Sequence, residues 1–549
     1  MEKRFLDLIL ESGEVSEQKL NVANKEQKRT KELLLEVIIR LGLLTREQIT
    51  RIWAQATGNP YIDLAVEKID EEAIKLVPKS LAEKFKLLPF AMHGDAIKVG
   101  MYNPGDIIGI DALRRATRRD IEIYVANLED INESIGLYFG EGILFDEEID
   151  KNIASAMTGA YVEGEKDPPV VRLIDLFIKK AIVERATDIH VSPDEKACRI
   201  SFRIDGIMRP QFVLPKQLQN QIITRIKVMS KLNIAEQRVP QDGNISFEYS
   251  GRYIDIRTST SPTDNGENVV LRLLDKVNIV MGMLSLGLSR TDNEAVNLLS
   301  LKPHGIVLSA GPTGSGKTTT LYSILQEIDA LERNILTIED PIEYRLPYIK
   351  QTQVNEKAGL TFAKAIRHFL RQDPDVILVG EIRDLETSKI AFQAAMTGHL
   401  VLSTIHTNDA ASSIARLMDL GIEAYLIPSC LRAVMAQRLV RKVCSHCSYE
   451  HTFTEDEINR YEITGNSLKS QKQGKGCIHC EDTGFRGRTG IFEILDITPS
   501  ISELILQKVS SDQILLRARE EGMRTMREDG IDKIRMGTTT MAEVYRVTG

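Results

Sequence analysis

The segment GIVLSAGPTGSGKTTTLYSILQEI, residues 305–328, decides the fold of the carboxyl-terminal half of the chain. Residues 311–318 match the pattern G-x-x-x-x-G-K-[ST], with a short apolar run before them and a helical pattern after them. The glycines let backbone N–H groups turn toward a phosphate, and the following helix adds the positive end of its dipole. The segment therefore predicts a strand–loop–helix unit that binds a nucleotide.

Each position of this loop has an expected role. Lys317 is expected to contact the β- and γ-phosphates, and Thr318 is expected to hold Mg²⁺. Hydrolysis would also need carboxylates that hold the metal ion and orient water. The residues predicted to contact the nucleotide in this segment are Gly311, Pro312, Thr313, Gly314, Ser315, Gly316, Lys317, Thr318 and Thr319.

Acidic residues follow two further apolar runs. The runs NILTI, DVILVG and LVLST alternate with helical patterns over about 284–435, which is typical of a parallel sheet covered on both faces. Glu339 and Glu343 come at the end of the first run, and Glu381 follows the second. We expect them at the edge of the sheet that carries the phosphate loop. Asp340, which precedes a proline, fits a turn equally well.

Two histidines bracket the run LVLST. His399 enters the expected strand and His406 leaves it, toward the edge where the phosphates are expected. A zinc site built from this pair is not expected, because no third ligand is suitably spaced. His406 is the candidate sensor of the γ-phosphate. His399 is kept as a candidate nucleotide contact, open between a supporting and a sensing role.

Four motifs in this order resemble those of a known family. GPTGSGKTTTLY, TIEDPIEY, LRQDPDVILVGEIRD and TGHLVLSTIHTND are similar to the Walker A, Asp box, Walker B and His box of the secretion ATPases that power type II secretion and type IV pilus assembly. The resemblance extends from about residue 170 to the end of the chain. It implies an α/β fold class, with a P-loop (RecA-like) ATPase domain, a preceding α+β domain, a zinc-binding insertion and a helical and α+β amino-terminal domain.

The resemblance also implies a function. It implies a hexameric cytoplasmic motor that hydrolyses ATP, with Mg²⁺, to assemble a pilus or pseudopilus at the inner membrane. Glu343 and Glu381 would share the work on Mg²⁺ and the attacking water, and which of them takes the proton stays open. Arginines of the preceding domain would reach the γ-phosphate; the matching positions are Arg257 and Arg272, with Arg203 as a third candidate. A surface ion pair is the alternative for each arginine.

Four cysteines form two C-x2-C pairs, separated by residues 448–476. In a reducing compartment such pairs are typical of metal ligands, and four thiolates complete a tetrahedral zinc site. His446 and His479 lie between the paired cysteines but are not needed as ligands. In the family that the chain resembles, this insertion marks an assembly motor rather than a retraction motor. The predicted zinc ligands are Cys444, Cys447, Cys477 and Cys480.

The first 58 residues look helical and contain a repeat, since residues 11–20 resemble residues 40–49. Each copy has a glycine suited to a left-handed helix end, followed by a Ser or Thr suited to cap the next helix. The pattern predicts two stacked helical hairpins. The glycines and caps are Gly13, Gly42, Ser16 and Thr45.

The amino-terminal region is expected to bind other proteins. Relatives that bind cyclic di-GMP carry Arg-Leu-Gly at the start of each repeat, whereas the aligned residues here are Arg4-Phe5-Leu6 and Leu33-Leu34-Leu35. We therefore expect docking to a membrane-anchored protein, with cyclic di-GMP binding as the alternative. The other expected partners are further copies of this chain, in a homohexamer, and an inner-membrane platform protein.

These patterns suggest four segments. They are a docking domain of tandem helical hairpins and a small α/β unit (1–140), an acidic linker (141–168), an α+β domain with the arginines (169–282), and the ATPase domain (283–549) with a zinc insertion at about 440–485 and a helical end.

Composition limits the class of protein. The chain has 549 residues, of which 42% are apolar and 27% charged, as in soluble globular proteins. A net charge of −8 argues against direct nucleic-acid binding. The longest weakly polar stretch, 279–288, is too short to span a bilayer, so we expect a cytoplasmic protein peripherally associated with the inner membrane. A DNA-uptake or conjugation ATPase and a nucleotide-dependent scaffold that does not hydrolyse ATP are the competing hypotheses.

Overall fold

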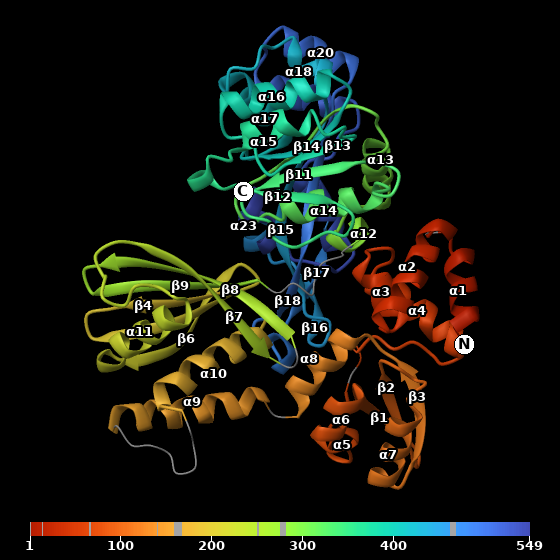
Figure 1. The fold of residues 1–549 in the computed structure, drawn as a ribbon, viewed down its shortest axis with the longest axis vertical. Coiled ribbons are helices and arrows are strands. Elements are labelled where there is room, and N and C mark those ends of the chain that lie inside the picture. The colour runs from red at the N-terminus through yellow and green to blue at the C-terminus, as the bar shows by residue number, and fades with distance from the viewer. Residues whose placement is uncertain are drawn as a thin grey trace. The chain divides into compact units, whose positions relative to one another are not determined.

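A computed structural model describes residues 2–549 except 14, 65–66, 68, 140, 159–166, 250–251, 275–281 and 462–467. The chain divides between residues 279 and 280 into two compact units. The elements of each unit are labelled in Figure 1.

The first unit begins with helices that match the predicted repeat. The side chains of Ser16 and Thr45 cap the helices that follow them, and Thr45 forms a capping box with Gln48. Gly13 and Gly42 have φ angles of 72° and 66°, the left-handed conformation that the sequence predicts at these two positions. The rings of Phe5 and Trp53 meet edge to face at 5.0 Å, so the first helix packs on the fourth. The helices are α1 (Glu2–Glu11), α2 (Glu17–Thr30), α3 (Leu34–Arg40) and α4 (Arg46–Thr57).

A small α/β unit follows. Its sheet has the order β1-β2-β3, in which β2 contains the run AIKVG (96–100) and β3 the run IEIYV (121–125). The core includes Leu87, Ile97 and Val99, which are fully buried. The elements are α5 (Glu71–Lys75), α6 (Lys79–Phe85), β1 (Leu87–His93), β2 (Ala96–Met101), α7 (Ile107–Thr117), β3 (Asp120–Val125) and α8 (Leu128–Tyr138).

The acidic segment contains a packed helix, α9 (Glu141–Thr158). Phe145 and Ile149 on one face of α9 are buried against the core beneath α10 (Pro169–Val183). Asp146 reaches the Nζ atom of Lys180 at 3.0 Å. The first part of the predicted linker is therefore helical and buries apolar side chains, whereas residues 159–166 lie outside the described residues.

An antiparallel sheet of order β6-β5-β4-β9-β8-β7 forms the second domain of this unit. Helices α10 and α11 supply the apolar side chains that cover one of its faces. The elements are β4 (Ala186–Pro193), β5 (Ala197–Ile204), β6 (Ile207–Pro215), α11 (Gln219–Met229), β7 (Gln241–Tyr249), β8 (Arg252–Thr263) and β9 (Gly266–Leu274).

The second unit is built on a seven-stranded sheet of order β12-β11-β13-β14-β10-β15-β18, in which only β18 is antiparallel to its neighbour. Every residue of β10, β11, β13 and β14 is buried, so both faces are covered as predicted. These four strands were predicted; the other three were not. The strands are β10 (Gly305–Ala310), β11 (Ile335–Glu339), β12 (Lys350–Gln353), β13 (Val376–Val379), β14 (Leu400–Ile405), β15 (Leu431–Val443) and β18 (Phe485–Asp496).

Helices cover the two faces of this sheet (Figure 1). Alternate strand residues enter two separate cores, so that Ile306 and Leu308 pack with α15–α17 while Val307 packs with α12–α14. The chain ends in four further helices, as the sequence predicts. The helices are α12 (Met283–Leu286), α13 (Arg290–Ser300), α14 (Lys317–Glu327), α15 (Phe362–Phe369), α16 (Leu385–Met396), α17 (Ala410–Asp419), α18 (Leu426–Cys430), α20 (Pro499–Leu506), α21 (Ser511–Glu520), α22 (Met526–Arg535) and α23 (Met541–Thr548).

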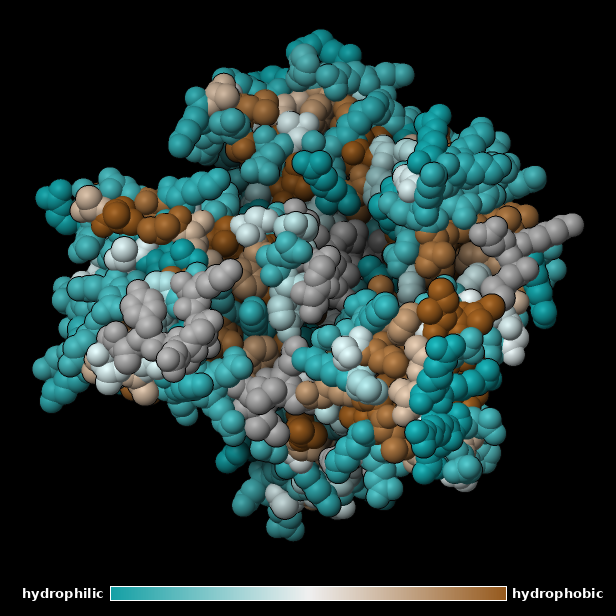
Figure 2. Space-filling view, turned by 60° about the horizontal axis from the view of Figure 1, so that its bottom comes forward, coloured by the Kyte–Doolittle hydropathy of each residue, from teal (hydrophilic) through white to brown (hydrophobic). Residues whose placement is uncertain are grey.

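The surface is mixed in polarity. In the view of Figure 2 hydrophilic residues predominate, and the hydrophobic ones form separate patches. None of the described helices combines the length and the apolar composition that crossing a bilayer requires.

A buried ion pair joins α11 to β9 and yields a stability prediction. The Nζ atom of Lys227 lies 2.5 Å from Glu267 Oε1, and both side chains are at most 6% exposed. Lys227→Met would leave the Glu267 carboxylate buried without a cation, which should destabilise this domain by about 3–5 kcal/mol. Lys227→Met/Glu267→Gln should recover most of that loss. Hydrogen exchange of the α11 and β9 amides measures the loss of stability in the single and the double variant. Equal losses of stability in the two variants would contradict the prediction.

Candidate functional site

The loop 311–316 lies between the carboxyl end of β10 and the first turn of α14. Gly314 and Gly316 have φ angles of 79° and 91°, which a residue with a Cβ adopts only with strain. A Cβ on Gly311 would also come within 2.5 Å of Ser315 Oγ. That Oγ atom is buried and has no hydrogen-bond partner within the described structure. The loop precedes the amino-terminal end of α14, where the helix dipole is positive, and the Ser315 hydroxyl there lacks a hydrogen-bond partner in the described structure. Such a loop suits an anionic ligand.

Lys317 is folded back onto this loop. Its Nζ atom donates to the carbonyl oxygens of Gly311 and Pro312, at 2.7 and 2.9 Å. Burial lowers the pKa of Lys317 to about 8, although the nearby Glu381 carboxylate opposes this shift. A phosphate could replace the two carbonyls and would restore the charge of the ammonium group.

Glu381 and His406 meet beside Lys317. Glu381 follows β13, and His406 follows β14. The Nε2 atom of His406 lies 3.5 Å from Glu381 Oε2. Burial, and after it the charge of Lys317, lowers the pKa of His406. Arg383, which the sequence analysis did not select, lies 2.5 Å from the same carboxylate. The edge of the sheet thus brings together three of the predicted residues.

Strand β15 adds two residues that the sequence analysis missed. Gln437 donates from Nε2 to the carbonyl oxygen of Ser315 at 2.7 Å and so holds the phosphate loop. Arg438 is close enough to Lys317 to influence its pKa, and it donates to the carbonyl of Asn408, two residues after His406. The Nε atom of Arg438 is buried and has no hydrogen-bond partner among the described residues. The segment QRLVRKV (437–443) shows no regular alternation of apolar and polar residues, so this strand was not predicted.

Glu339 has a different environment from the one expected. Its side chain is 2% exposed, and its carboxylate accepts hydrogen bonds from Thr337 Oγ1 at 2.5 Å, from Gln351 Nε2 at 3.1 Å, and from the hydroxyl of Tyr322. Both carboxylate oxygens are therefore engaged by the protein. This last residue of β11 points into the interior, and its contact with the nucleotide stays a prediction.

Glu343 lies in the loop after β11, four residues beyond Glu339, and is partly exposed. Its charge contributes to raising the pKa of Tyr344 and of Glu339, so it lies near both. Of the two acids at positions 340 and 343, Asp340 is exposed and Glu343 is partly exposed, so both carboxylates are open to a ligand.

His399 lies at the other end of β14. Its Nδ1 atom is 2.9 Å from the carbonyl oxygen of Ala394 and 3.1 Å from Thr397 Oγ1. Its own carbonyl accepts the N–H of Gly305, the first residue of β10. The phosphate loop begins after the last residue of β10, about 17 Å away at about 3.3 Å per residue. Within one chain the ring of His399 is bonded at the end of β14 away from the phosphate loop, and its contact with the nucleotide stays a prediction.

Three predicted arginines share one face of the antiparallel sheet in the first unit. Strand pairing sets Arg257 opposite Arg272, Arg272 opposite Asp188, and Asp188 opposite Arg203. Directly opposed residues point to the same side of a sheet. This side is turned away from the helices, since the sequence neighbours of the arginines, Phe202, Ile256 and Leu271, are buried beneath α10 and α11.

Asp188 holds two of these arginines. Its Oδ1 atom lies 3.0 Å from the Nε atom of Arg272, and its Oδ2 atom lies 3.6 Å from the Nε atom of Arg203. The Arg272 side chain is 59% exposed, and the ion pair uses its Nε atom. Its two terminal nitrogens therefore point outward, available to an anion.

The four cysteines form a candidate metal centre. Their Sγ atoms lie within 4.8 Å of one another, with separations of 3.8 Å for Cys444–Cys477 and for Cys447–Cys480 and 3.7 Å for Cys477–Cys480. Thiolates at a Zn–S distance of about 2.3 Å stand about 3.8 Å apart at the corners of a tetrahedron. The Cys480 sulfur also accepts the N–H groups of Cys477 and Gly484, as a charged thiolate would.

A small hairpin separates the cysteine pairs. It contains β16 (Ser448–Thr452), α19 (Glu455–Arg460) and β17 (Ser470–Gly474). Gly474 and Gly484 cross so closely that a Cβ on Gly474 would lie 2.1 Å from the carbonyl oxygen of Gly484. The rings of His446 and His479 stack on each other at 3.7 Å, and neither belongs to the cluster of ligand atoms.

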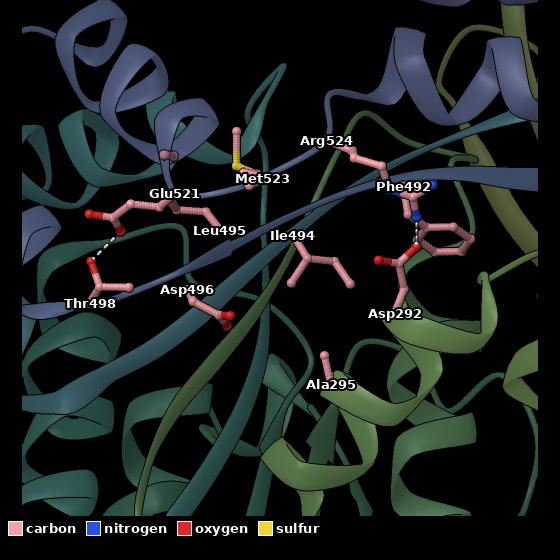
Figure 3. A pocket seen from close by; sticks show the side chains of 12 residues that line it. Asp292, Ala295, Phe492, Ile494, Leu495, Asp496, Thr498, Glu521, Met523 and Arg524 are labelled. Atoms are coloured by element: carbon pink, nitrogen blue, oxygen red, sulfur yellow. Dashed lines mark hydrogen bonds and ion pairs between the residues drawn. The ribbon is translucent and has the colours of Figure 1, made fainter.

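A cavity of about 190 Å³ lies away from the phosphate loop, between α13, β18 and the turn before α22 (Figure 3). Its wall carries Asp292, Asp496 and Glu521, and its arginine, Arg524, already pairs with Asp292 at 2.5 Å. The carboxylates make this cavity unsuitable for a nucleotide phosphate.

Two family models match the chain. Residues 163–546 match the family model described as "Type II/IV secretion system protein", and residues 57–143 match the MshEN domain. The chain is 38% identical to the type IV pilus assembly ATPase PilB of Myxococcus xanthus, over 99% of this chain and 98% of that protein. It is 39% identical to the type II secretion system ATPase E of Vibrio cholerae, over 88% of this chain and 99% of that protein.

A solved structure shares the fold. The ATPase DotB of Legionella pneumophila superposes with a TM-score of 0.51 at 22% identity, covering 70% of this chain and 97% of DotB. Because the family model spans the arginine-bearing domain, the phosphate loop and the four cysteines, the chain belongs to the type II/IV secretion system protein family.

Proposed function

We propose that this chain is an ATPase motor that hydrolyses ATP to drive assembly of a pilus or a secretion pseudopilus at the inner membrane. The observation that carries the proposal is the convergence of Lys317, Glu381 and His406 at one edge of the sheet, beside the phosphate loop. Two full-length relatives that are named as assembly or secretion ATPases support the same reading.

The residues at this edge divide the work. Lys317 binds the β- and γ-phosphates, and Thr318 with Glu381 holds Mg²⁺, which would supply neutralisation of the phosphate charge. Glu343, whose carboxylate is open, orients the attacking water and takes its proton. Glu381 is a poorer base, because Arg383 and His406 already lie against its carboxylate. His406 senses the γ-phosphate through this contact.

The predicted arginines would act on the γ-phosphate of a bound nucleotide. Arg272 and Arg257, with Arg203 beside them, neutralise the γ-phosphate as charge develops on it. Their common face and the free terminal nitrogens of Arg272 support this role. In a homohexamer each arginine-bearing domain would close on a nucleotide and release it after hydrolysis.

Two further assignments follow from the rest of the chain. Zinc would be held by the four cysteine thiolates, where it stabilises the hairpin structurally. The amino-terminal domain would dock on a membrane-anchored partner and the second unit on a platform protein, which places this cytoplasmic motor at the membrane. Cyclic di-GMP remains the alternative ligand of the amino-terminal domain.

Substitution of the proposed catalytic residues tests the ATPase directly. Phosphate release should fall at least about 100-fold in Lys317→Ala, Glu381→Gln, Glu343→Gln and Arg272→Ala, because each loses a charge that the transition state needs. Arg199→Ala, an exposed arginine of the same sheet, is the matched control and should keep full activity. A wild type no faster than Lys317→Ala would establish the scaffold hypothesis, and turnover that requires DNA would establish a DNA motor.

The lowered pKa of Lys317 predicts a pH dependence of nucleotide affinity. With a pKa of about 8 in the free protein, Lys317 loses its proton as the pH rises past 8, whereas the bound phosphate favours the charged form. The affinity for Mg-ADP should fall by up to about tenfold per pH unit above 8, with uptake of a proton on binding. Lys317→Arg should remove the dependence, and the exposed Lys302→Ala should retain it. Calorimetry that finds constant affinity up to pH 9.5 would contradict this assignment.

Metal analysis tests the cysteine cluster. The purified protein should carry about one zinc ion per chain, and Cys480→Ser should lose it. Cys430→Ser changes a buried cysteine outside the cluster and should keep the metal. Less than half an equivalent of zinc in the wild type would refute the site.

A further inference from the structure

Tyr322 connects the helix of the phosphate loop to the loop that carries Glu343. Its ring is completely buried in α14, five residues after Lys317. Its hydroxyl donates to the Glu339 carboxylate and accepts from Gln351 Nε2 at 3.4 Å, and the backbone N–H of Glu343 lies close enough to lower its pKa. Burial, strengthened by the charge of Glu339, raises the pKa of Tyr322, so the phenol keeps its proton and remains a donor.

Gln351 of β12 holds the same loop from the other side. Its Nε2 atom donates to Glu339 Oε1 and to the carbonyl oxygen of Tyr344, both at 3.1 Å. Its Oε1 atom accepts the N–H of Leu346 at 2.7 Å. Backbone groups at positions 344 and 346 are thus bonded to the partly buried Gln351, while the N–H of Glu343 lies beside the buried Tyr322 hydroxyl.

The aromatic ring of Tyr344 closes the arrangement. It meets the ring of Tyr322 edge to face at 4.6 Å, and the hydroxyl of Thr319 in the first turn of α14 forms a hydrogen bond with its phenol. The charged groups near this cluster are the carboxylates of Glu339 and Glu343. The described contacts of Glu339 are all neutral donors, so its charge is stabilised by directional hydrogen bonds alone.

We propose that Tyr322, Glu339 and Gln351 are positioning residues that hold Glu343 in a fixed place relative to the phosphate loop. This inference rests on the proposed ATPase activity, in which Glu343 acts on the attacking water. Apolar side chains of the same volume would fill the space, but only hydrogen bonds fix the backbone of 343–346 in one conformation. A base must be held within a fraction of an ångström of its water, and a displacement of about 1 Å costs about 100-fold in rate.

A double-mutant cycle separates positioning from general stability. Tyr322→Phe removes one oxygen atom, and it should lower kcat by about 10- to 100-fold while leaving KM for ATP within about twofold. In a Glu343→Gln background the same change should lower kcat by less than about twofold, because the group that Tyr322 positions is already lost. Tyr449→Phe is the matched control, since it removes a hydroxyl bonded to Gln473 in β17. Full activity of Tyr322→Phe, or equal losses in the two backgrounds, would overturn the proposal.

Hydrogen exchange tests the holding of the loop without any turnover. In the nucleotide-free protein, Tyr322→Phe and Gln351→Leu should both accelerate exchange of the amides of Glu343 and Leu346, while the amides of β13 stay protected. Unchanged exchange in both variants would overturn the proposal even if kcat fell. A wild type without ATPase activity would instead refute the proposed function, and the catalytic part of this inference with it.

Discussion

Parallel hydrogen bonding of β10 between β14 and β15 is the constraint on which the candidate site depends. It sets Ala310 beside Ile405 and Ala436, so that the segments leaving these positions begin at the same level of the sheet. The loop after β10, His406 after β14, and Gln437 in β15 then lie together, although more than 120 residues separate the first from the last. Because β10 and β14 are buried on both faces, and β15 is largely buried where it pairs with β10, a shift of one residue would move apolar side chains between the two cores and would be strongly opposed.

Local patterns were sufficient for much of this fold. The phosphate loop, four central strands and the caps at Ser16 and Thr45 follow from contacts within a few residues, and all are present. The cysteine spacing likewise predicted four sulfur atoms in one place. In each case residues that are close in the sequence determine the feature: the glycines of the phosphate loop, the capping side chains, or the paired cysteines.

Other features depend on pairing between distant segments and were missed or misplaced. Arg438 and Gln437 matter only because β15 lies next to β10, and Gln351 matters only because β12 lies next to β11. The sequence pattern could not show which of Glu339 and Glu343 has a buried carboxylate. A strand that is buried on both faces, such as β11, has no alternation of apolar and polar residues that would indicate the direction of the acid at its end. The arginine residues were selected by resemblance. That they lie side by side across one face of the sheet depends on the register of four strands, which the sequence does not show.

This arrangement has a mechanical consequence. Arg257, Arg272, Asp188 and Arg203 belong to four hydrogen-bonded strands, so their backbones move as one body. A slip of any strand by one residue would turn its arginine toward the helices, which excludes gradual adjustment of a single charge. Any displacement of this sheet would therefore carry the charged groups at all four positions together.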